Sequence, residues 1–439
     1  MAKTNTLVVA AAISVLFGLA TNAQQDRSAA ANASPARQTG TDEYTRYDLL
    51  DPDSASFKIN YEVTATTAGA NYFYNPIRKG SVASDEAVYD SMTGAPLRFE
   101  VVSGADARHD PLMADADSAT NYIKVHLARP VPPEGQGRVL IVKTYKDAKS
   151  YYRDGDAIVF NRPLGIRRNK VVLPAGYELV ACNVQSQVLS EPDGRISISF
   201  MNASAGEAPL ILRGKAGAQT GAAARPRAAT NTRSWESPFE GETERHRLSE
   251  RAHQDRDIVC FLEQPETHSF SLYHDYTETR PTANKYLNVV REGSTVSNPS
   301  AYVLDTGEKL QTRIMTGAEL AAASIKAEEP VSPMSQVVVI PFTPPKQGQS
   351  IRLRITETYT APVSYRLDGD ELVFDRSFGR ARNAVVLPAG WYLTASAIPA
   401  TVIELPDGRI RLDFWNGRSD SIDVLIKAKR RATPVAAAP

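Results

Sequence analysis

The chain contains one long motif twice, and this repeat limits its architecture more than any other feature. VFNRPLGIRRNKVVLPAGYEL begins at Val159, and VFDRSFGRARNAVVLPAGWYL begins at Val373. The spacing of 214 positions between these two residues holds without a gap from Arg138 to Asn202, and it becomes 213 farther upstream. This period far exceeds the ~20–50 residues of a solenoid repeat. The sequence therefore predicts two homologous domains, each folding as an independent globule.

The repeat divides the 439 residues into segments. The stretch between the copies begins with AGAQTGAAARPRAATNT, whose Ala, Gly, Pro and Thr content is typical of a flexible linker. We expect a signal peptide over residues 1–23, a disordered lead-in over 24–43, the first repeat over 44–215, a linker over 216–254, the second repeat over 255–429 and a disordered tail over 430–439. Two domains on a flexible tether would bind two epitopes with increased avidity.

Hydrophobic and polar residues alternate inside both copies. In the first copy, Phe57, Ile59 and Tyr61 are separated by single polar residues. A period of two is typical of antiparallel strands with one face in a core and the other in water. Pro-Asp-Gly turns at 192–194 and 406–408 have the composition of hairpin connections. The sequence therefore predicts an all-β protein with two tandem homologous antiparallel β-sandwich domains.

The N-terminal residues have the three parts of a secretory signal. Lys3 precedes an apolar run over residues 7–20, and small residues follow as far as Ala23. We expect cleavage after Ala23 and an exported protein, either periplasmic or extracellular. The alternative is an uncleaved anchor, but the run is shorter than the ~20 residues that span hydrocarbon. No second apolar stretch has spanning length, so we expect no membrane span after cleavage.

Charge and histidine content argue against several functions. The chain has 50 Lys and Arg against 50 Asp and Glu, and this balance gives no steering toward phosphate, so no nucleic-acid partner is expected. None of the six histidines lies in an HExxH frame or at zinc-site spacing. We therefore expect no metal, no cofactor and no enzymatic activity.

Paired carboxylates leave a hydrolase as a third hypothesis. Asp154 and Asp156 in the first copy recur as Asp368 and Asp370 in the second. Two neighbouring carboxylates can do acid–base work when their pKa values are driven apart. Asp-Gly-Asp is also an ordinary hairpin sequence, and we favour that interpretation.

The two cysteines lie on opposite sides of the linker. In an oxidising compartment, Cys182 and Cys260 are candidates for a disulfide that would tie the two halves together. The alternative is a pair of buried thiols that act as small hydrophobic side chains. We favour the thiols slightly, because a bridge requires close Cβ atoms.

A set of polar residues recurs between a strand and the run VVLPAG in both copies. Arginine side chains at such a loop could grip carboxylate groups and form a binding rim. The alternative is that the same side chains bond to backbone carbonyls and hold a long crossover in place. The candidate rim consists of Arg162, Arg168 and Asn169, repeated as Arg376, Arg382 and Asn383.

Aromatic residues cluster at several strands. Because adjacent strand residues face opposite sides, each cluster is expected to place one ring in the core and one outside. Exposed rings on a sandwich can stack on sugars, whereas the alternative is packing at a strand edge or between the copies. The candidate sugar contacts are Tyr72, Tyr74, Trp391 and Trp415.

Two segments resemble a known family. RPVPPEGQGRVLIVKTYKDAKSY and VVLPAGYELVACN are similar to the N-terminal β domain of zinc aminopeptidases, in which a strand after a Pro/Gly turn precedes a Pro-x-Gly-aromatic segment. The HExxH helix of that family's catalytic domain is absent from this sequence, so the resemblance implies no peptidase activity. The whole chain also resembles duplicated exported β-sandwich proteins of unknown function from environmental bacteria.

These features together favour a non-catalytic binding or structural module that engages a protein or a cell-envelope component. The alternative is a carbohydrate-binding protein that recognises polysaccharide through exposed aromatic rings. The third hypothesis is the carboxylate-dependent hydrolase.

Overall fold

The computed structural model describes residues 37–203, 206–217, 250–253, 255–327, 331–418 and 420–431. The predicted signal peptide, its cleavage site after Ala23, most of the predicted linker and the tail from residue 432 lie outside the described residues. The first strand, β1, begins at Gly40, inside the segment predicted to be a disordered lead-in, so that boundary moves toward the N-terminus.

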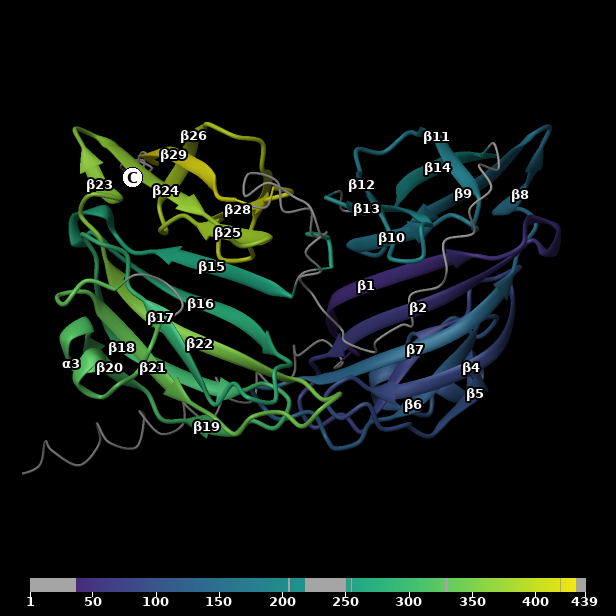
Figure 1. Cartoon of the computed structure of the whole chain (residues 1–439), viewed down its shortest axis with the longest axis horizontal. Coiled ribbons are helices and arrows are strands. Elements are labelled where there is room, and N and C mark those ends of the chain that lie inside the picture. The colour runs from purple at the N-terminus through teal and green to yellow at the C-terminus, as the bar shows by residue number, and fades with distance from the viewer. Residues whose placement is uncertain are drawn as a thin grey trace, which may run out of the picture.

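The first half is built on one long sheet with two smaller sheets packed against it (Figure 1). The long sheet has the order β12 (Gln187–Ser190), β13 (Ile196–Met201), β10 (Arg168–Val172), β1 (Gly40–Leu49), β2 (Ser56–Ala65), β7 (Gly137–Lys146) and β4 (Val82–Asp90). The four-stranded sheet has the order β11 (Tyr177–Cys182), β14 (Ala208–Ala216), β9 (Ala157–Leu164) and β8 (Tyr151–Asp154). The three-stranded sheet has the order β3 (Tyr72–Pro76), β6 (Asn121–His126) and β5 (Phe99–Ser103). The connections carry η1 (Pro52–Ser54), α2 (Gly104–Ala107) and η2 (Pro111–Met113).

The second half has the same arrangement of sheets (Figure 1). Its long sheet has the order β27 (Thr401–Glu404), β28 (Ile410–Trp415), β25 (Arg382–Val386), β15 (Arg256–Leu262), β16 (Ser269–Glu278), β22 (Ile351–Thr360), β18 (Thr295–Val303) and β19 (Lys309–Leu310). Its four-stranded sheet has the order β26 (Trp391–Ser396), β29 (Ile422–Arg430), β24 (Glu371–Phe378) and β23 (Tyr365–Asp368). Its three-stranded sheet has the order β17 (Lys285–Val289), β21 (Gln336–Pro341) and β20 (Arg313–Thr316). The connections carry η3 (Pro265–Thr267) and α3 (Gly317–Ala322).

Strand register also repeats between the halves. Arg162 on β9 lies opposite Leu210 on β14, and Arg376 on β24 lies opposite Val424 on β29. The all-β class is therefore confirmed, and residues at the spacing of the sequence repeat occupy matching places. One pair of strands in each half is parallel, however: β1 with β10, and β15 with β25. The chain builds β8 and β9 in the smaller sheet before it returns as β10, and this crossover brings β10 in beside β1 in the same direction.

Buried aromatic rings join the sheets of each half. Phe57 on β2 meets Phe160 on β9 edge to face at 5.3 Å, and Phe270 on β16 meets Phe374 on β24 in the same way at 5.6 Å. All four side chains are fully buried. Burial of each contributes roughly 1.5–3 kcal/mol to folding. Each half therefore has a core of its own.

Polar contacts hold the two halves together. Arg138 on β7 donates to both carboxylate oxygens of Asp305, from Nε at 2.6 Å and from Nη2 at 3.0 Å. Its counterpart on β22, Arg352, donates in the reverse direction to Thr64 and Gln136 of the first half, at 3.4 Å each. Arg138 and Asp305 are buried. Arg138 also donates to Ser350 at 3.3 Å, and Ser350 corresponds to Gln136, so these two contacts are reciprocal, as at a two-fold related interface, and the halves pack on each other.

Residues 250–253, which the sequence predicts to belong to the linker, are docked between the halves. Glu250 pairs with Lys170 of the first half at 2.5 Å between Oε2 and Nζ. Arg251 donates from Nη2 to the carbonyl oxygen of Gly379 in the second half at 2.7 Å. The sequence leaves open whether the halves pack together or move freely, and in the structure the described end of the linker bonds to both of them.

Candidate functional site

Arg162, a predicted rim residue, lies inside the first half with a carboxylate beside it. The side chain is 4% exposed, and its Nη1 donates to Asp147 Oδ2 at 3.1 Å and to Ser150 Oγ at 3.2 Å. Its guanidinium also lies over the rings of Phe57 and Tyr145, at 5.4 and 5.7 Å from their centroids. The protein's own carboxylate thus compensates this buried charge.

Arg376 occupies the matching place in the second half without that carboxylate. It is 8% exposed and lies over the rings of Phe270 and Tyr359, at 5.3 and 5.4 Å. At the position that corresponds to Asp147, this half has Ala361. The Nη1 atom of Arg376 is buried and has no hydrogen-bond partner among the described residues. A buried cation without a partner is costly, so this arginine requires an explanation beyond packing.

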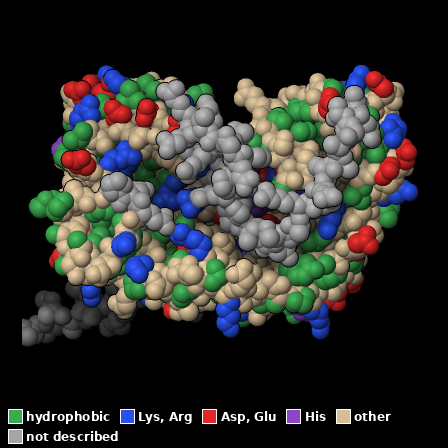
Figure 2. All heavy atoms as spheres, in the orientation of Figure 1, with side chains coloured by type: hydrophobic (Ala, Val, Ile, Leu, Met, Phe, Trp, Pro, Cys, Tyr) green, Lys and Arg blue, Asp and Glu red, His purple; other side chains and the backbone are tan. Residues whose placement is uncertain are grey.

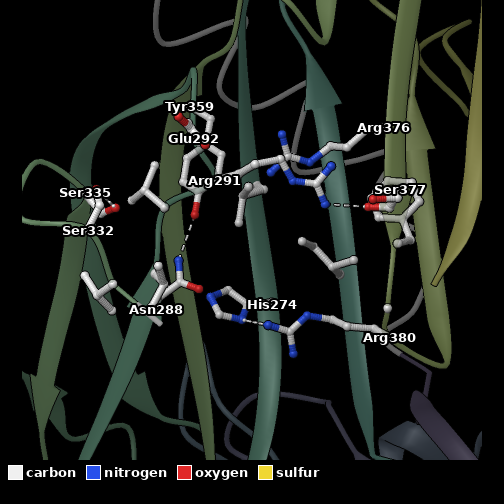
Figure 3. A pocket seen from close by; sticks show the side chains of 17 residues that line it. His274, Asn288, Arg291, Glu292, Ser332, Ser335, Tyr359, Arg376, Ser377 and Arg380 are labelled. Atoms are coloured by element: carbon white, nitrogen blue, oxygen red, sulfur yellow. Dashed lines mark hydrogen bonds between the residues drawn. The ribbon is translucent and has the colours of Figure 1, made fainter. Parts of the chain in front are cut away.

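A cavity of about 740 Å³ opens beside Arg376, and we call it the Arg376 cavity (Figure 3). Its walls come from β16 of the long sheet, from β17 of the three-stranded sheet and from the end of β24 of the four-stranded sheet. The cavity therefore lies where the two smaller sheets leave part of the long sheet uncovered. Its volume is in the range of sites that hold organic ligands. Arg376 is the only one of the six predicted rim residues that lines it.

Two further arginines line the Arg376 cavity. Arg291 donates from Nη2 to the carbonyl oxygen of Ser377 at 2.9 Å, and Figure 3 shows its guanidinium beside that of Arg376. Burial and the charge of Arg376 lower the pKa of Arg291. Arg380 approaches Nδ1 of His274 with its Nη2 at 2.8 Å. Figure 2 shows Lys and Arg side chains at several places on the left-hand half of this face.

His274 is a neutral group in this cavity. Burial, together with the charge of Arg380, holds the pKa of His274 well below its usual range. Because a guanidinium only donates, Nδ1 of His274 must accept from Arg380, and Nε2 carries the proton. This Nε2–H is buried and has no hydrogen-bond partner among the described residues. Figure 3 places the ring between Arg380 and Asn288.

A buried carboxyl group lies behind the cavity wall. Glu357 on β22 accepts from Asn288 Nδ2 at 2.7 Å, and the same amide donates to the hydroxyl of Tyr359 at 2.8 Å. Burial raises the pKa of Glu357 to about 7. The corresponding residue of the first half is Lys143, whose Nζ donates to Asn75 Oδ1 at 2.7 Å. The sign of the charge at this position is therefore reversed between the halves.

The remaining predicted rim residues hold backbone segments. Asn169 donates to the carbonyl oxygen of Ile166 at 2.7 Å, and Asn383 donates to that of Arg380 at 2.9 Å. Both asparagines are buried. These bonds fit the alternative interpretation, in which the recurring polar residues fix a crossover.

Two rim arginines hold the segment between the halves. Arg168 is buried and donates to the carbonyl oxygen of His253 at 3.2 Å. Arg382 pairs with Asp255 at 3.4 Å between Nη2 and Oδ1. The six residues therefore do not form one continuous exposed rim, because they point to three different places.

Among the predicted sugar contacts, Tyr74 and Trp391 are buried, which corrects the expectation that they face solvent. Trp391 is 1% exposed and donates from Nε1 to Gln264, whereas its neighbour Tyr392 is the exposed ring of that pair. Tyr74 packs with Tyr122 under the loop that follows β5, because that loop covers the outer face of β3. The alternation rule fails there because both faces of the strand are covered.

The other two aromatic candidates are partly exposed. Tyr72 lies edge to face with His126 at 5.0 Å, and Lys124 Nζ lies 4.4 Å from the centre of its ring. Trp415 lies opposite Arg382 in the pairing of β25 with β28. These residues belong to different halves, so the four candidates do not form one surface.

Cys182 and Cys260 are both free thiols, so the candidate disulfide is not formed. Cys260 is buried in the core of the second half, where burial raises its pKa to about 12. Cys182 packs against the core of the first half. Two thiols in separate cores cannot approach to bonding distance.

The carboxylates proposed for a hydrolase pair with cations across neighbouring strands. Asp154 bonds to Arg213 at 2.6 Å and Asp156 to Lys215 at 2.8 Å, and all four side chains are exposed. This arrangement is typical of a hairpin end. In the part of the chain that the structure describes, no three His, Cys, Asp or Glu side chains gather where they could hold a metal ion.

Several residues at the cavity were missed because they differ between the copies. Arg380 corresponds to Ile166, His274 to Tyr61, and Glu357 to Lys143. Arg376 and Arg291 recur as Arg162 and Arg78, whereas Arg380, His274 and Glu357 have no like residue in the first copy and are therefore invisible to a search for shared residues. A comparison of mismatched repeat positions would have found them.

Comparison with known proteins gives only faint structural likeness. No family model matches the chain, and no curated protein matches it. An M1 zinc metallopeptidase from Deinococcus radiodurans matches with a TM-score of 0.28 and 12% identity over 41% of this chain and 42% of that chain. An aminopeptidase N family protein from Idiomarina loihiensis matches with a TM-score of 0.23 and 14% identity, over 39% of this chain and 29% of that one. The collagen adhesin of S. aureus matches with a TM-score of 0.17 and 6% identity over 78% of this chain and 86% of that one.

The chain thus spans less than half the length of these metallopeptidases. The resemblance to zinc aminopeptidases that the sequence suggests is confirmed as a faint likeness of structure, and likenesses this weak carry no functional information. Among the described residues, no helix is both long and apolar enough to cross a membrane.

Proposed function

We propose that this chain is an exported, non-catalytic binding protein that engages acidic groups of a protein or cell-envelope component through the Arg376 cavity. One observation carries the proposal: Nη1 of Arg376 is buried beside a cavity of about 740 Å³ and has no hydrogen-bond partner among the residues that the structure describes. Unfavourable buried electrostatics cluster at functional sites. An acidic group entering the cavity would supply the charge that Ala361 does not.

Export is part of this proposal and rests on the N-terminal sequence. The apolar run and the small residues before Ala23 support cleavage there. Fractionation of the native host, followed by N-terminal sequencing of the mature protein, tests it. We expect a chain that begins at Gln24 outside the cytoplasm, and an uncleaved chain in the cytoplasm would contradict the proposal.

Binding can be tested with the full chain immobilised on a sensor. We expect an octamer of glutamate to bind and an octamer of glutamine not to bind. Raising the salt concentration from about 0.05 to about 0.5 M should weaken the complex, because salt screens the charges. Arg291→Met should abolish binding, whereas Arg78→Met, its counterpart outside the cavity, should retain it. The two variants are a matched pair, because both arginines are exposed and donate to equivalent carbonyl oxygens. Equal behaviour of the two variants would contradict the proposal.

A further inference from the structure

We infer that the Arg376 cavity seats a compact, doubly charged oxyanion head group between Arg291 and Arg376, of the phosphomonoester or dicarboxylate class. This inference deepens the proposed function and rests on it. It adds the charge and the shape of the group that the cavity would select.

The first argument is the vacant counter-charge. In the first half, Arg162 has a carboxylate oxygen 3.1 Å from its Nη1. In the second half the same atom of Arg376 is buried and unpartnered in the described structure. Asp147 therefore indicates what this guanidinium position binds, namely an oxyanion. With alanine at residue 361, no carboxylate of the described chain takes that place, and we assign it to an oxyanion of the ligand.

The second argument is the number of charges. Three arginines line the Arg376 cavity, and Glu292 is the one carboxylate among the lining residues. His274 is neutral, because burial and Arg380 depress its pKa. Among the described lining residues, three positive charges face one negative charge, an excess of two, while Asp257 and Asp423 act on Arg380 and Arg291 from outside the lining. A head group with two negative charges matches that excess, whereas a single carboxylate matches half of it.

The third argument is the arrangement of donors. Arg376 presents an unpartnered Nη1, and Arg291 lies beside it with only its bond to Ser377 O among the described contacts. Forked guanidinium groups side by side suit a group with several oxygens, because each can donate two parallel hydrogen bonds. His274 adds a buried Nε2–H without a partner in the described structure.

The fourth argument is the size of the cavity. A volume of about 740 Å³ is much larger than a phosphate or a dicarboxylate head group. Val289, Val290 and Val331 line part of its wall, and Ser332 and Ser335 add hydroxyl groups. The remaining volume therefore has room for the body of an organic molecule that carries the head group.

Calorimetric titration of the full chain tests this inference. The dianion probes are glucose 6-phosphate and glutarate, and the monoanion probes of matching size are glucuronate and butyrate. We expect at least one dianion to bind roughly tenfold or more tightly than its monoanion counterpart, the difference that one additional charge-assisted contact gives. Comparison of glucose 6-phosphate with glutarate shows whether the cavity selects a phosphomonoester or a dicarboxylate.

Variants assign the binding to the cavity. Arg376→Met and Arg291→Met should each weaken dianion binding by at least roughly tenfold. Arg78→Met, the counterpart of Arg291→Met in the first half, should leave it unchanged. Circular dichroism of each variant establishes that the fold is retained.

The outcomes separate the inference from the proposed function. If glucuronate or butyrate binds as tightly as both dianions, the inference is overturned and the binding of acidic ligands stands. If Arg291→Met has no effect on dianion binding, the head group does not lie where we place it. If neither the small anions nor the glutamate octamer bind, the proposed function itself fails.

Discussion

Arg162 and Arg376 share a backbone environment, but only Arg162 has a carboxylate that compensates its charge. Each pairs in register with an apolar residue on the neighbouring strand and covers a phenylalanine and a tyrosine ring. The first half supplies Asp147, and the second half supplies Ala361 and an adjoining cavity. One copy of the repeat thus pairs the arginine with its own carboxylate, whereas the other leaves Nη1 without a hydrogen-bond partner among the described residues.

A second difference accompanies the first. Lys143 and Glu357 occupy matching places opposite Ile59 and Leu272, and each bonds to an equivalent asparagine. Burial lowers the pKa of Lys143 to about 8 and raises that of Glu357 to about 7. Both side chains therefore shift toward their neutral forms. The comparison teaches that one buried position can hold a lysine or a glutamate, because the neighbouring asparagine accepts a hydrogen bond from the first and donates one to the second.

The largest expected effect is on stability, from removing the arginine of each half. Arg162→Met leaves Asp147 without its cation and should lower the free energy of unfolding by about 4 kcal/mol. Arg376→Met removes a buried charge whose Nη1 has no hydrogen-bond partner among the described residues, and it should not lower the free energy of unfolding. Urea denaturation of both full-length variants measures the contrast. Equal losses would mean that the two arginines play the same structural role.

The second prediction concerns pH and Glu357. The unfolded chain releases this proton near the usual pKa of 4.5, whereas the folded chain holds it up to about pH 7. The folded state therefore binds more protons in that window, and stability falls as pH rises from 4.5 to 7, by about 3 kcal/mol in total. The charge of Arg380 and the bond from Asn288 act against this shift.

Glu357→Gln should remove that slope. The difference in unfolding free energy between the parent chain and the variant, measured from pH 4 to pH 8, isolates this carboxyl from the others. A difference that stays constant with pH would show that Glu357 is ionised throughout.

The third prediction concerns Lys143 and has the opposite sign. The unfolded chain keeps this proton up to the usual pKa of 10.5, whereas the folded chain loses it near pH 8 because the amine is buried close to Arg162. The unfolded state binds more protons between these values, so stability rises with pH across the window, by about 3 kcal/mol at most. Lys143→Met should flatten this rise, and a slope that persists in the variant would contradict the prediction.

The smallest expected change in stability comes from restoring the missing carboxylate. Ala361→Asp would place an acid where Ser294, Ser364 and Arg376 correspond to the partners of Asp147. We expect unfolding free energy to change by no more than about 1 kcal/mol, because a new ion pair offsets the burial of a charge. Glutarate titration should show clearly weaker binding, and unchanged affinity would contradict the proposed role of Ala361.

Much of the fold follows from the sequence, because alternation and turns are local. The period of two around Phe57 predicts β2, and Pro-Asp-Gly predicts the hairpin in which Gly194 adopts a φ of 83°. The packing of the halves does not follow, since Arg138 and Asp305 meet only in three dimensions. Alternation also indicates that one ring of the Trp391 pair is buried without indicating which one.

The candidate site can be predicted from the sequence only in part. The repeat brings out Arg162 and Arg376 as matching residues. Their difference depends on Asp147, which lies in another loop, and only the folded structure shows that it touches Arg162. The replacement of this aspartate by Ala361 is visible in the sequence, but its consequence for a buried guanidinium is not.

Anomalous diffraction from crystals soaked in selenate tests the central claim most directly. Selenate is a dianion whose selenium atom can be located without a model of the ligand. The account predicts an anomalous peak between Arg291 and Arg376, and no peak between Arg78 and Arg162. Peaks of equal height in both halves, or a peak in the first half alone, would contradict it.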